Sequence, residues 1–506
     1  MTMNKNETKI ILLLVLFVII FRMLVFSQIS TDTLISSNQE PSLRFLEPVD
    51  SIIADLESYI PKFMHEENIP GVAIALIRNS KVVWKKGFGV MNTITAEPVT
   101  PGTLFEVASN SKLVSTYIAL QLVDQGILSL DEPLNSYLSD PWLPPSEYRN
   151  AIALRHVLSH SSGLGHLTFS RESLFAPGKG YSYSNKGFLY LQAAIEQLTG
   201  QSLEELAQKM VFTPLGMSSS SFINDPTFTS RTANGHVHAI IPVLFFIVPY
   251  LVALVFVGLI CILILRIWKG HWRVTLRMVF VTLFISLGLA LLPIFILFIN
   301  FGILKFAWLI VFCGITITIA LILIFVLIRG ILLMLFTERI KFLNTLVVVL
   351  SVLTIFGLIL LSSKITNLPV PKWSPASASA AWSLRATAGD MATFLIELSE
   401  PRYLNSEISK QLRTSNVSLS PEISWGLGPG IQHSKFGDAL WQWGQNIDFQ
   451  SVLIIYPKHG FGVVVLTNND LHNPDVAIEI AHRSLGGPID PILRASHLEF
   501  NYSEVP

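Results

Sequence analysis

Cysteine is nearly absent from this 506-residue chain, and charged residues are scarce. The two cysteines, Cys261 and Cys313, both lie inside apolar runs, so the polar parts offer neither a disulfide framework nor a cysteine-based metal site. Only 14% of the residues are charged and 51% are hydrophobic, which is unusual for a soluble protein. We therefore expect a membrane portion, and a polar domain that is stabilised by its core alone.

No charge of either sign is in excess. The chain has 35 basic and 35 acidic residues, so nothing draws it generally toward nucleic acid. We find no repeat of fixed period. Gly426, Gly428 and Gly430 lack the strand–loop–helix setting of a dinucleotide or phosphate loop. We expect no cofactor and no nucleic-acid partner.

Long apolar runs are concentrated in one part of the chain. Each is long enough for the roughly 20 residues that span a hydrocarbon core, although a buried soluble helix is the alternative for any one of them. Basic residues gather in the first and third connections, and the positive-inside rule places both in the cytoplasm. We predict a four-helix transmembrane insert at residues 239–364, from runs at 239–265, 278–304, 306–328 and 342–363.

The amino terminus has its own apolar run. Lys5 and Lys9 precede it, and no A-x-A-like cleavage site follows. Residues 1–30 are expected to be a signal anchor or a signal peptide, and the anchor is preferred. Because four spans return the chain to the same side, residues 45–238 and 365–506 are predicted to form one extracytoplasmic domain.

Helices and antiparallel strands are mixed in these two polar parts. Apolar residues at helical spacing alternate with short runs of β-forming residues bounded by turns. The pattern predicts helices at 52–65, 110–125 and 387–398, and strands at 71–77, 81–87, 451–456 and 462–466.

A serine and a lysine stand three residues apart where the second helix begins. Ser109 and Lys112 would share one helical face, so the amine could reach the hydroxyl. A serine hydroxyl is a weak nucleophile until a group such as a partly neutral lysine removes its proton. Alternatively, Ser109 is a helix N-cap and Lys112 a solvated helix residue.

Several further segments support the catalytic interpretation. In order, residues 105–112, 152–164, 177–185, 381–395 and 425–428 resemble segments of the class C β-lactamase-related family, which includes penicillin-binding carboxypeptidases, β-lactamases, esterases and D-amino-acid peptidases. The resemblance implies an α/β (α+β) β-lactamase/transpeptidase-like sandwich, in which helices cover an antiparallel sheet beside a helical region. Here the transmembrane insert would interrupt this fold.

The resemblance also implies roles for individual residues. Ser109 would be the acylated nucleophile, Lys112 its proton acceptor, Tyr183 a second acid or base, and Asn185 a hydrogen-bond donor to substrate or lysine. Tyr181 competes with Tyr183 for its role. Without the serine–lysine pair, Tyr183 and Asn185 would be interpreted as a loop that anchors the next helix.

The third family element departs from its usual form. Gln442-Trp443-Gly444 aligns where relatives have Lys-Thr-Gly or His-x-Gly. Gly444 would let a strand approach the substrate, and the amides of Ser109 and Gln445 would form the oxyanion hole. A neutral Gln442 in the substrate-binding position cannot pair with a carboxylate, so it favours an ester or amide without one. The neighbouring tryptophans could equally be core packing.

Histidines raise a competing hypothesis of metal binding. His156 and His160 are one helical turn apart, like half of a zinc site, and His166 follows. No glutamate stands beside His156 as a metalloprotease motif requires. The resemblance explains this segment as structural support, so no metal is predicted.

These observations predict a membrane-embedded serine hydrolase that acts through an acyl-enzyme. Its substrates would be peptidoglycan peptides, D-alanyl esters or related amides and esters. The alternative is a non-hydrolytic receptor for a cell-wall or β-lactam ligand, coupled to the transmembrane helices. The expected partners are the substrate and the lipid bilayer, in a bacterial envelope with the catalytic domain outside the cell.

Overall fold

The computed structural model describes residues 42–165, 174–237, 368–369, 378–469, 475–488 and 491–492. All of them belong to one compact unit, Ser42–Pro506. The predicted signal anchor or signal peptide at residues 1–30 and the third histidine, His166, lie outside the described residues.

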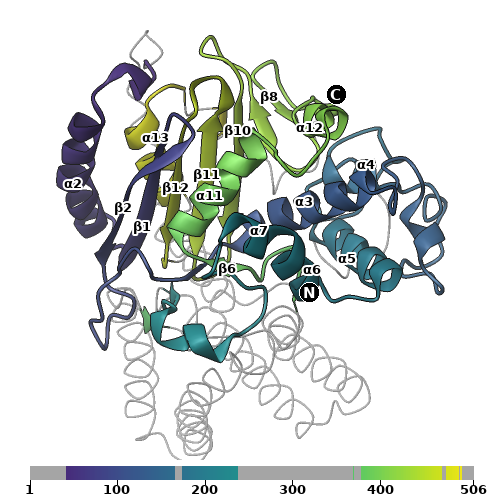
Figure 1. The fold of residues 1–506 in the computed structure, drawn as a ribbon, viewed down its shortest axis with the longest axis horizontal. Helices are drawn as coiled ribbons and strands as arrows, with labels where there is room; N and C mark the ends of the chain where they lie inside the picture. The colour runs from purple at the N-terminus through teal and green to yellow at the C-terminus, as the bar shows by residue number, and fades with distance from the viewer. Residues whose placement is uncertain are drawn as a thin grey trace, which may run out of the picture. The chain divides into compact units, whose positions relative to one another are not determined.

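An antiparallel sheet of eight strands forms the centre of this unit (Figure 1). Its order is β2-β1-β12-β11-β10-β9-β8-β7, so a hairpin from the first polar part joins six strands from the second through the pairing of β1 with β12. The strands are β1 (Gly71–Arg78), β2 (Lys81–Gly89), β7 (Val417–Ser418), β8 (Ile423–Trp425), β9 (Gly430–Gln432), β10 (Ala439–Gln445), β11 (Gln450–Tyr456) and β12 (Phe461–Thr467).

Both faces of the sheet are covered, which explains why its central strands are apolar throughout rather than alternating. On one face lie α2 (Val49–Glu66) and α13 (Val476–Leu485), which pack against Val72, Ile74 and Leu76 of β1. On the other lies α11 (Ala388–Ser399), beside alternate residues of the same strand. Successive side chains of a strand point to opposite faces, so β1 contributes to both clusters.

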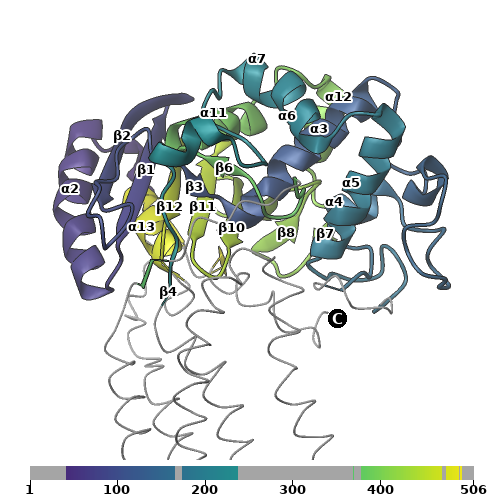
Figure 2. The same ribbon diagram turned by 90° about the horizontal axis from the view of Figure 1, so that it is seen from below.

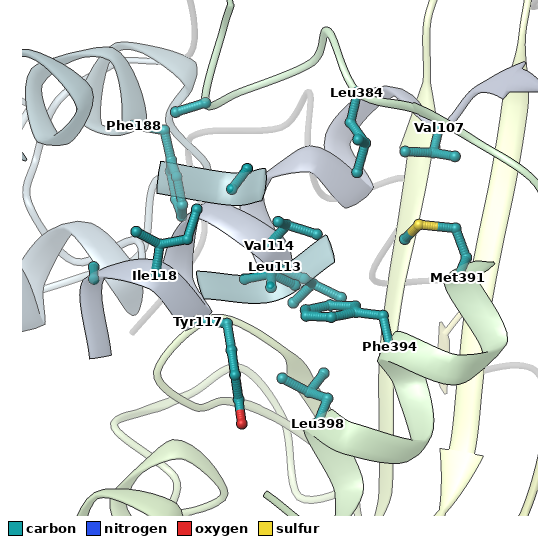
Figure 3. Packing of buried hydrophobic residues seen from close by; sticks show 14 of the residues in the cluster. Val107, Leu113, Val114, Tyr117, Ile118, Phe188, Leu384, Met391, Phe394 and Leu398 are labelled. Carbon is teal, nitrogen blue, oxygen red and sulfur yellow. The ribbon is translucent and has the colours of Figure 1, made fainter. Parts of the chain in front are cut away.

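A helical region adjoins the sheet, as Figures 1 and 2 both show. Its central helix, α3 (Ser111–Asp124), is buried along almost its whole length. Figure 3 shows Val114 and Tyr117 of α3 beside Phe394 and Leu398 of α11. The other helices are α4 (Leu154–Leu158), α5 (Asn185–Thr199), α6 (Leu203–Ala207), α7 (Thr213–Leu215) and α12 (Ser406–Leu412). Because α3 packs against both α11 and this region, its first turn is held between the sheet and the helices.

Two short strand pairings join the parts of the chain on either side of residues 238–367, which lie outside the described residues. β3 (Phe105–Glu106) pairs with β6 (Arg385–Ala386), and β4 (His236–Val237) pairs with β5 (Leu368–Pro369). The second pairing brings the two ends of the stretch together. The boundaries predicted for the domains, 45–238, 239–364 and 365–506, stay a prediction.

The transmembrane part of the predicted fold class needs a correction. Within the described ranges, no helix is both long enough and apolar enough to cross a bilayer. The longest, α2, has 18 residues but carries charges such as Asp50, Glu57 and Lys62 on its exposed side. The predicted insert, residues 239–364, lies outside the described residues. The fold is therefore corrected to the α/β arrangement alone, in which helices cover an antiparallel sheet.

Candidate active site

Ser109 lies in a tight turn immediately before α3. Residues Ala108–Asn110 form a 3₁₀ turn, and Ala108 has a φ of 48°, a left-handed conformation that is rare for residues other than glycine. Ser111 holds the turn in place, because its Oγ donates to the Ala108 carbonyl oxygen at 2.6 Å and accepts from the Leu384 amide at 3.0 Å. Such backbone strain persists only where the surroundings fix it, and it is common at functional sites.

Lys112 lies one helical turn further on, and its side chain reaches Ser109. The Lys112 Nζ is 2.9 Å from the Ser109 Oγ and 3.0 Å from the Ala381 carbonyl oxygen. Lys112 is 1% exposed and Ser109 is 8% exposed. The solvated-helix alternative for Lys112 is therefore wrong, since a lysine is rarely buried unless a specific contact requires it.

Tyr183 lies beside this pair, just before α5. The Lys112 Nζ is 4.7 Å from the centroid of the Tyr183 ring, and the Tyr183 hydroxyl accepts a hydrogen bond from Gln442 Nε2 at 3.0 Å. The ring of Tyr181 packs instead against Trp425, at 5.4 Å between centroids. The geometry therefore favours Tyr183 over Tyr181 as the third member of the site.

Asn185 is the first residue of α5, and Ser184 is its N-cap, with Oγ accepting from the Gly187 amide at 2.9 Å. Burial lowers the pKa of Lys186, the next residue. The Ser184 cap is compatible with the alternative in which this segment anchors the next helix, and it coexists with the placement of Tyr183 beside the serine–lysine pair. The donor role of Asn185 stays a prediction.

His160 fixes both neighbours of Tyr183. Its carbonyl oxygen accepts from the Ser182 amide at 2.8 Å, and its Nδ1 accepts from the Ser184 amide at 3.1 Å. Its ring is 4.2 Å from the Tyr183 ring, between centroids. The sequence offered the metal hypothesis for this residue, but the structure uses its ring to position Tyr183.

His156 has a local role as well. Its Nδ1 accepts from the Ala153 amide at 3.1 Å, at the beginning of α4. Burial lowers the pKa of His156, against the opposing effect of the Asp131 charge. A ring nitrogen that accepts an amide proton cannot also bind a metal ion. Nδ1 of His156 and Nδ1 of His160 both accept backbone amides, so neither nitrogen is available to a zinc ion.

The third predicted element lies on β10, against the serine turn. Gln442 is 1% exposed and reaches Tyr183 across the site. Trp443 stacks on Tyr183 at 5.5 Å and on Trp441 at 5.2 Å. The core-packing alternative for the tryptophans is therefore confirmed, and it also places a flat surface behind the Tyr183 ring.

Gly444 is where β10 comes closest to Ser109. A Cβ at this position would lie 2.3 Å from the Val107 carbonyl oxygen, 2.5 Å from Ser451 Oγ and 3.0 Å from the Ser109 amide nitrogen. Only glycine fits this approach. The structure thus brings the strand that carries Gln445 to the turn that contains Ser109, and the oxyanion-hole role of the Ser109 and Gln445 amides stays a prediction.

Ser451, for which no role was expected from the sequence, supports the turn from β11. Its Oγ donates to the Val107 carbonyl oxygen at 2.8 Å and accepts from Asn110 Nδ2 at 2.8 Å. The available signal was a serine directly before the apolar run of a predicted strand. Buried hydroxyls need partners, so such a serine indicates a polar contact across the fold.

A buried ion pair was also missed. The Glu106 carboxylate accepts from Arg385 NH2 at 2.9 Å and from Asn446 Nδ2 at 2.8 Å, and the side chains of the pair are 6% and 7% exposed. Glu106 is three residues before Ser109, and Asn446 directly follows Gln445. The pair therefore joins the nucleophile turn to the end of β10.

Replacing Glu106 with glutamine is expected to destabilise the protein by about 3–5 kcal/mol, because the buried Arg385 charge would lose its counter-ion. Urea unfolding of purified protein measures this change. The double variant Glu106→Gln with Arg385→Met is expected to recover much of the loss, since no unpaired charge remains. A loss below about 1 kcal/mol for Glu106→Gln would show that the pair is dispensable.

Fold and site together define a class of protein. A buried serine–lysine pair at the start of a helix, with a tyrosine beside it and a glycine of β10 packed against it, is an arrangement that can activate a serine hydroxyl. The family model for Beta-lactamase matches residues 56–244 and 362–486, which is more than half of the chain. The chain belongs to this family of serine hydrolases, as the sequence segments predict.

Curated relatives cover part of the chain. Esterase EstB from Burkholderia gladioli is 26% identical over 211 residues, 34% of this chain and 52% of that protein. A Beta-lactamase from Pseudomonas fluorescens is 30% identical over 197 residues, with shares of 36% and 54%. A putative D-alanyl-D-alanine carboxypeptidase from Escherichia coli O157:H7 is 26% identical over 187 residues, with shares of 30% and 43%. The chain spans about half the length of the curated relatives it matches.

Solved structures share the fold. The octameric penicillin-binding protein homologue from Pyrococcus abyssi has a TM-score of 0.56 at 18% identity, over 88% of this chain and 81% of that one. D-alanine carboxypeptidase AmpC from Burkholderia cenocepacia has a TM-score of 0.53 at 14% identity, over 86% of this chain and 99% of that one. The predicted β-lactamase/transpeptidase-like α/β fold is therefore confirmed.

Proposed function

We propose that the protein is a serine hydrolase that cleaves an ester or amide through an acyl-enzyme on Ser109. The observation that carries this proposal is the buried contact of 2.9 Å between Lys112 Nζ and Ser109 Oγ. The lysine is 1% exposed, so its amine faces this hydroxyl rather than bulk solvent. A buried amine in contact with a serine hydroxyl is one of the arrangements that can activate a nucleophile for acyl transfer.

The reaction would proceed in two halves. In the first, Ser109 Oγ attacks the carbonyl carbon, its proton passes to Lys112 or Tyr183, and the same groups return a proton to the departing alcohol or amine. In the second, water attacks the acyl-enzyme, gives one proton to the leaving Ser109 oxygen, and releases the carboxylic acid. The amides of Ser109 and Gln445 would stabilise the oxyanion in both halves.

We further propose that the substrate carries no carboxylate next to the scissile bond. The third element supplies a neutral Gln442 where many relatives have a cation, and a carboxamide cannot ion-pair with a carboxylate. The relatives named esterase and carboxypeptidase make both D-alanyl esters and peptidoglycan peptides reasonable candidates. Among these, the ester is the better fit, because it has no carboxylate that would need a cation at position 442.

Two matched esters test this preference. Each would carry the same leaving group and acyl chain, and one would add a carboxylate beside the carbonyl. The wild-type protein is expected to hydrolyse the neutral ester with the higher kcat/KM, by about 10-fold or more, because one unpaired buried charge costs at least 1.4 kcal/mol. Faster turnover of the charged ester would contradict the proposed substrate class.

Loss of activity in Ser109→Ala tests the proposed nucleophile. Hydrolysis of the neutral ester is expected to fall to the background rate, because nothing else in the proposed mechanism can form the acyl-enzyme. Ser136→Ala is the control, since it removes an exposed hydroxyl that bonds Glu132 and the Pro133 carbonyl oxygen, and full activity is expected. Equal hydrolysis by wild type and Ser109→Ala would refute the proposed nucleophile.

A receptor that is acylated but does not turn over is the second candidate. A burst of leaving group equal to the protein concentration, with no steady-state rate after it, would favour the receptor over the hydrolase. We retain an extracytoplasmic location of the catalytic domain as a proposal, which labelling of intact cells with a membrane-impermeant serine probe would test.

A further inference from the structure

The amide nitrogen of Gln442 is fully used inside the protein. Its Nε2 donates to the Tyr183 hydroxyl at 3.0 Å and to the Trp443 carbonyl oxygen at 3.0 Å. A carboxamide nitrogen carries two N–H groups, so neither is left for a substrate. These two contacts are therefore an alternative to the expectation from the sequence that this side chain binds substrate.

The Trp443 contact also fixes which end of the amide faces Tyr183. A backbone carbonyl oxygen can only accept a hydrogen bond, so the atom beside it must be the nitrogen of Gln442. The same nitrogen is in contact with the Tyr183 oxygen, which must then accept. The proton of the Tyr183 hydroxyl is consequently directed away from Gln442.

Other groups hold the ring of Tyr183 while Gln442 holds its oxygen. The ring lies 4.7 Å from Lys112 Nζ, 4.2 Å from the His160 ring and 5.5 Å from the Trp443 ring. Tyr183 and Gln442 are each 1% exposed, so little solvent competes for their hydrogen bond. The bond connects the two polar parts of the chain directly, from the segment before α5 to β10.

We propose that Gln442 is a positioning residue, which sets the direction of the Tyr183 hydroxyl rather than contacting substrate. By donating to the Tyr183 oxygen, it leaves the phenol proton to be exchanged on the side of the Ser109–Lys112 pair. This inference rests on the proposed function, because a direction for the Tyr183 proton matters only if Tyr183 transfers protons during acyl transfer.

The proposal predicts an effect on kcat rather than on KM. Gln442→Met has a similar length and no donor, so kcat for the neutral ester is expected to fall by about 10- to 100-fold, part of the effect of a complete acid or base, while KM changes by less than about twofold. Gln442→Glu keeps the length and accepts rather than donates when ionised, so the same loss is expected. It serves as the second variant if Gln442→Met does not fold.

A double-mutant cycle with Tyr183→Phe tests whether Gln442 acts through Tyr183. In the Tyr183→Phe background, where the oxygen is absent, Gln442→Met is expected to have no further effect on kcat. Full additivity of the two losses would overturn the positioning role. A KM that rises about 10-fold or more at unchanged kcat would also overturn it, in favour of a substrate contact.

A fluorophosphonate probe separates failure of this inference from failure of the proposed function. If wild-type Ser109 is not labelled, the proposed function fails and the inference with it. If Ser109 is labelled and the cycle is additive, only the role of Gln442 fails. If Ser109 is labelled and the losses in the double-mutant cycle are not additive, both the proposed function and the positioning role of Gln442 are supported.

Discussion

Replacing Lys112 with methionine is expected to lower kcat/KM for the neutral ester by about 1,000-fold, within the range of roughly 100- to 10,000-fold that a general acid or base supplies. The Lys112 Nζ lies 2.9 Å from Ser109 Oγ, within hydrogen-bond distance of the hydroxyl whose proton it would accept. Methionine matches the length of the lysine stem and removes the amine. Steady-state hydrolysis with wild-type and variant protein measures the loss.

Protein stability provides the control for this variant. Lys112 is 1% exposed, so exchange of its amine for an apolar group leaves no buried charge behind, and thermal unfolding is expected to change little. Lys209→Met, at an exposed lysine of the helical region, is expected to retain full activity. Activity of Lys112→Met within about 10-fold of the wild type would contradict the role of this amine as proton acceptor.

Gly444→Ala is expected to lower kcat/KM by about 100- to 1,000-fold, the loss that follows when one oxyanion-hole donor is displaced. The added Cβ would meet the Val107 carbonyl oxygen at 2.3 Å and Ser451 Oγ at 2.5 Å, so β10 must move away from the nucleophile turn. The same overpacking is expected to destabilise the protein by about 1–3 kcal/mol. Kinetics and urea unfolding, measured on the same preparation, separate the two effects.

Gly102→Ala is the matched control for this substitution. At that position, a new Cβ would have no neighbour closer than 3.8 Å, so activity and stability are expected to stay within about 0.5 kcal/mol of the wild type. A Gly444→Ala protein with normal kcat/KM would show that β10 does not shape the oxyanion site.

Local patterns predicted four of the eight strands of the sheet, β1, β2, β11 and β12, and two of the three helices that cover it, α2 and α11. The run Gly71–Arg78 and its hairpin partner form β1 and β2, and the helix expected at 110–125 is α3, Ser111–Asp124. These elements were predictable because their apolar residues recur at the spacing of the element itself. The short strands β7, β8 and β9 were not predicted, because two or three residues carry too little periodicity.

The candidate site was predictable where its chemistry follows from spacing within one element. Ser109 and Lys112 are three residues apart on a single helix, and the structure brings them into contact. The contacts of Gln442 with Tyr183 and of Glu106 with Arg385 join residues far apart in sequence, so no local spacing could reveal them. His160 was ambiguous because a histidine at helical spacing serves equally well as a metal ligand or as a hydrogen-bond acceptor.

The expectation of a transmembrane insert shows the limit of arguing from apolar length alone. It rested on apolar length in residues 239–364, and no helix in the described part of the chain has the character of a membrane span. The α/β domain needs no such element to form its sheet, since β1 pairs directly with β12. The fold of the site can therefore be explained from the polar parts alone.

Mass spectrometry of the protein after reaction with a fluorophosphonate tests the central claim most directly. We expect one adduct per chain, on the peptide that contains Ser109, and none on the Ser109→Ala protein. Lys112→Met is expected to form the same adduct far more slowly, because its serine is no longer activated. An adduct on another residue, or undiminished labelling of Ser109→Ala, would contradict the account.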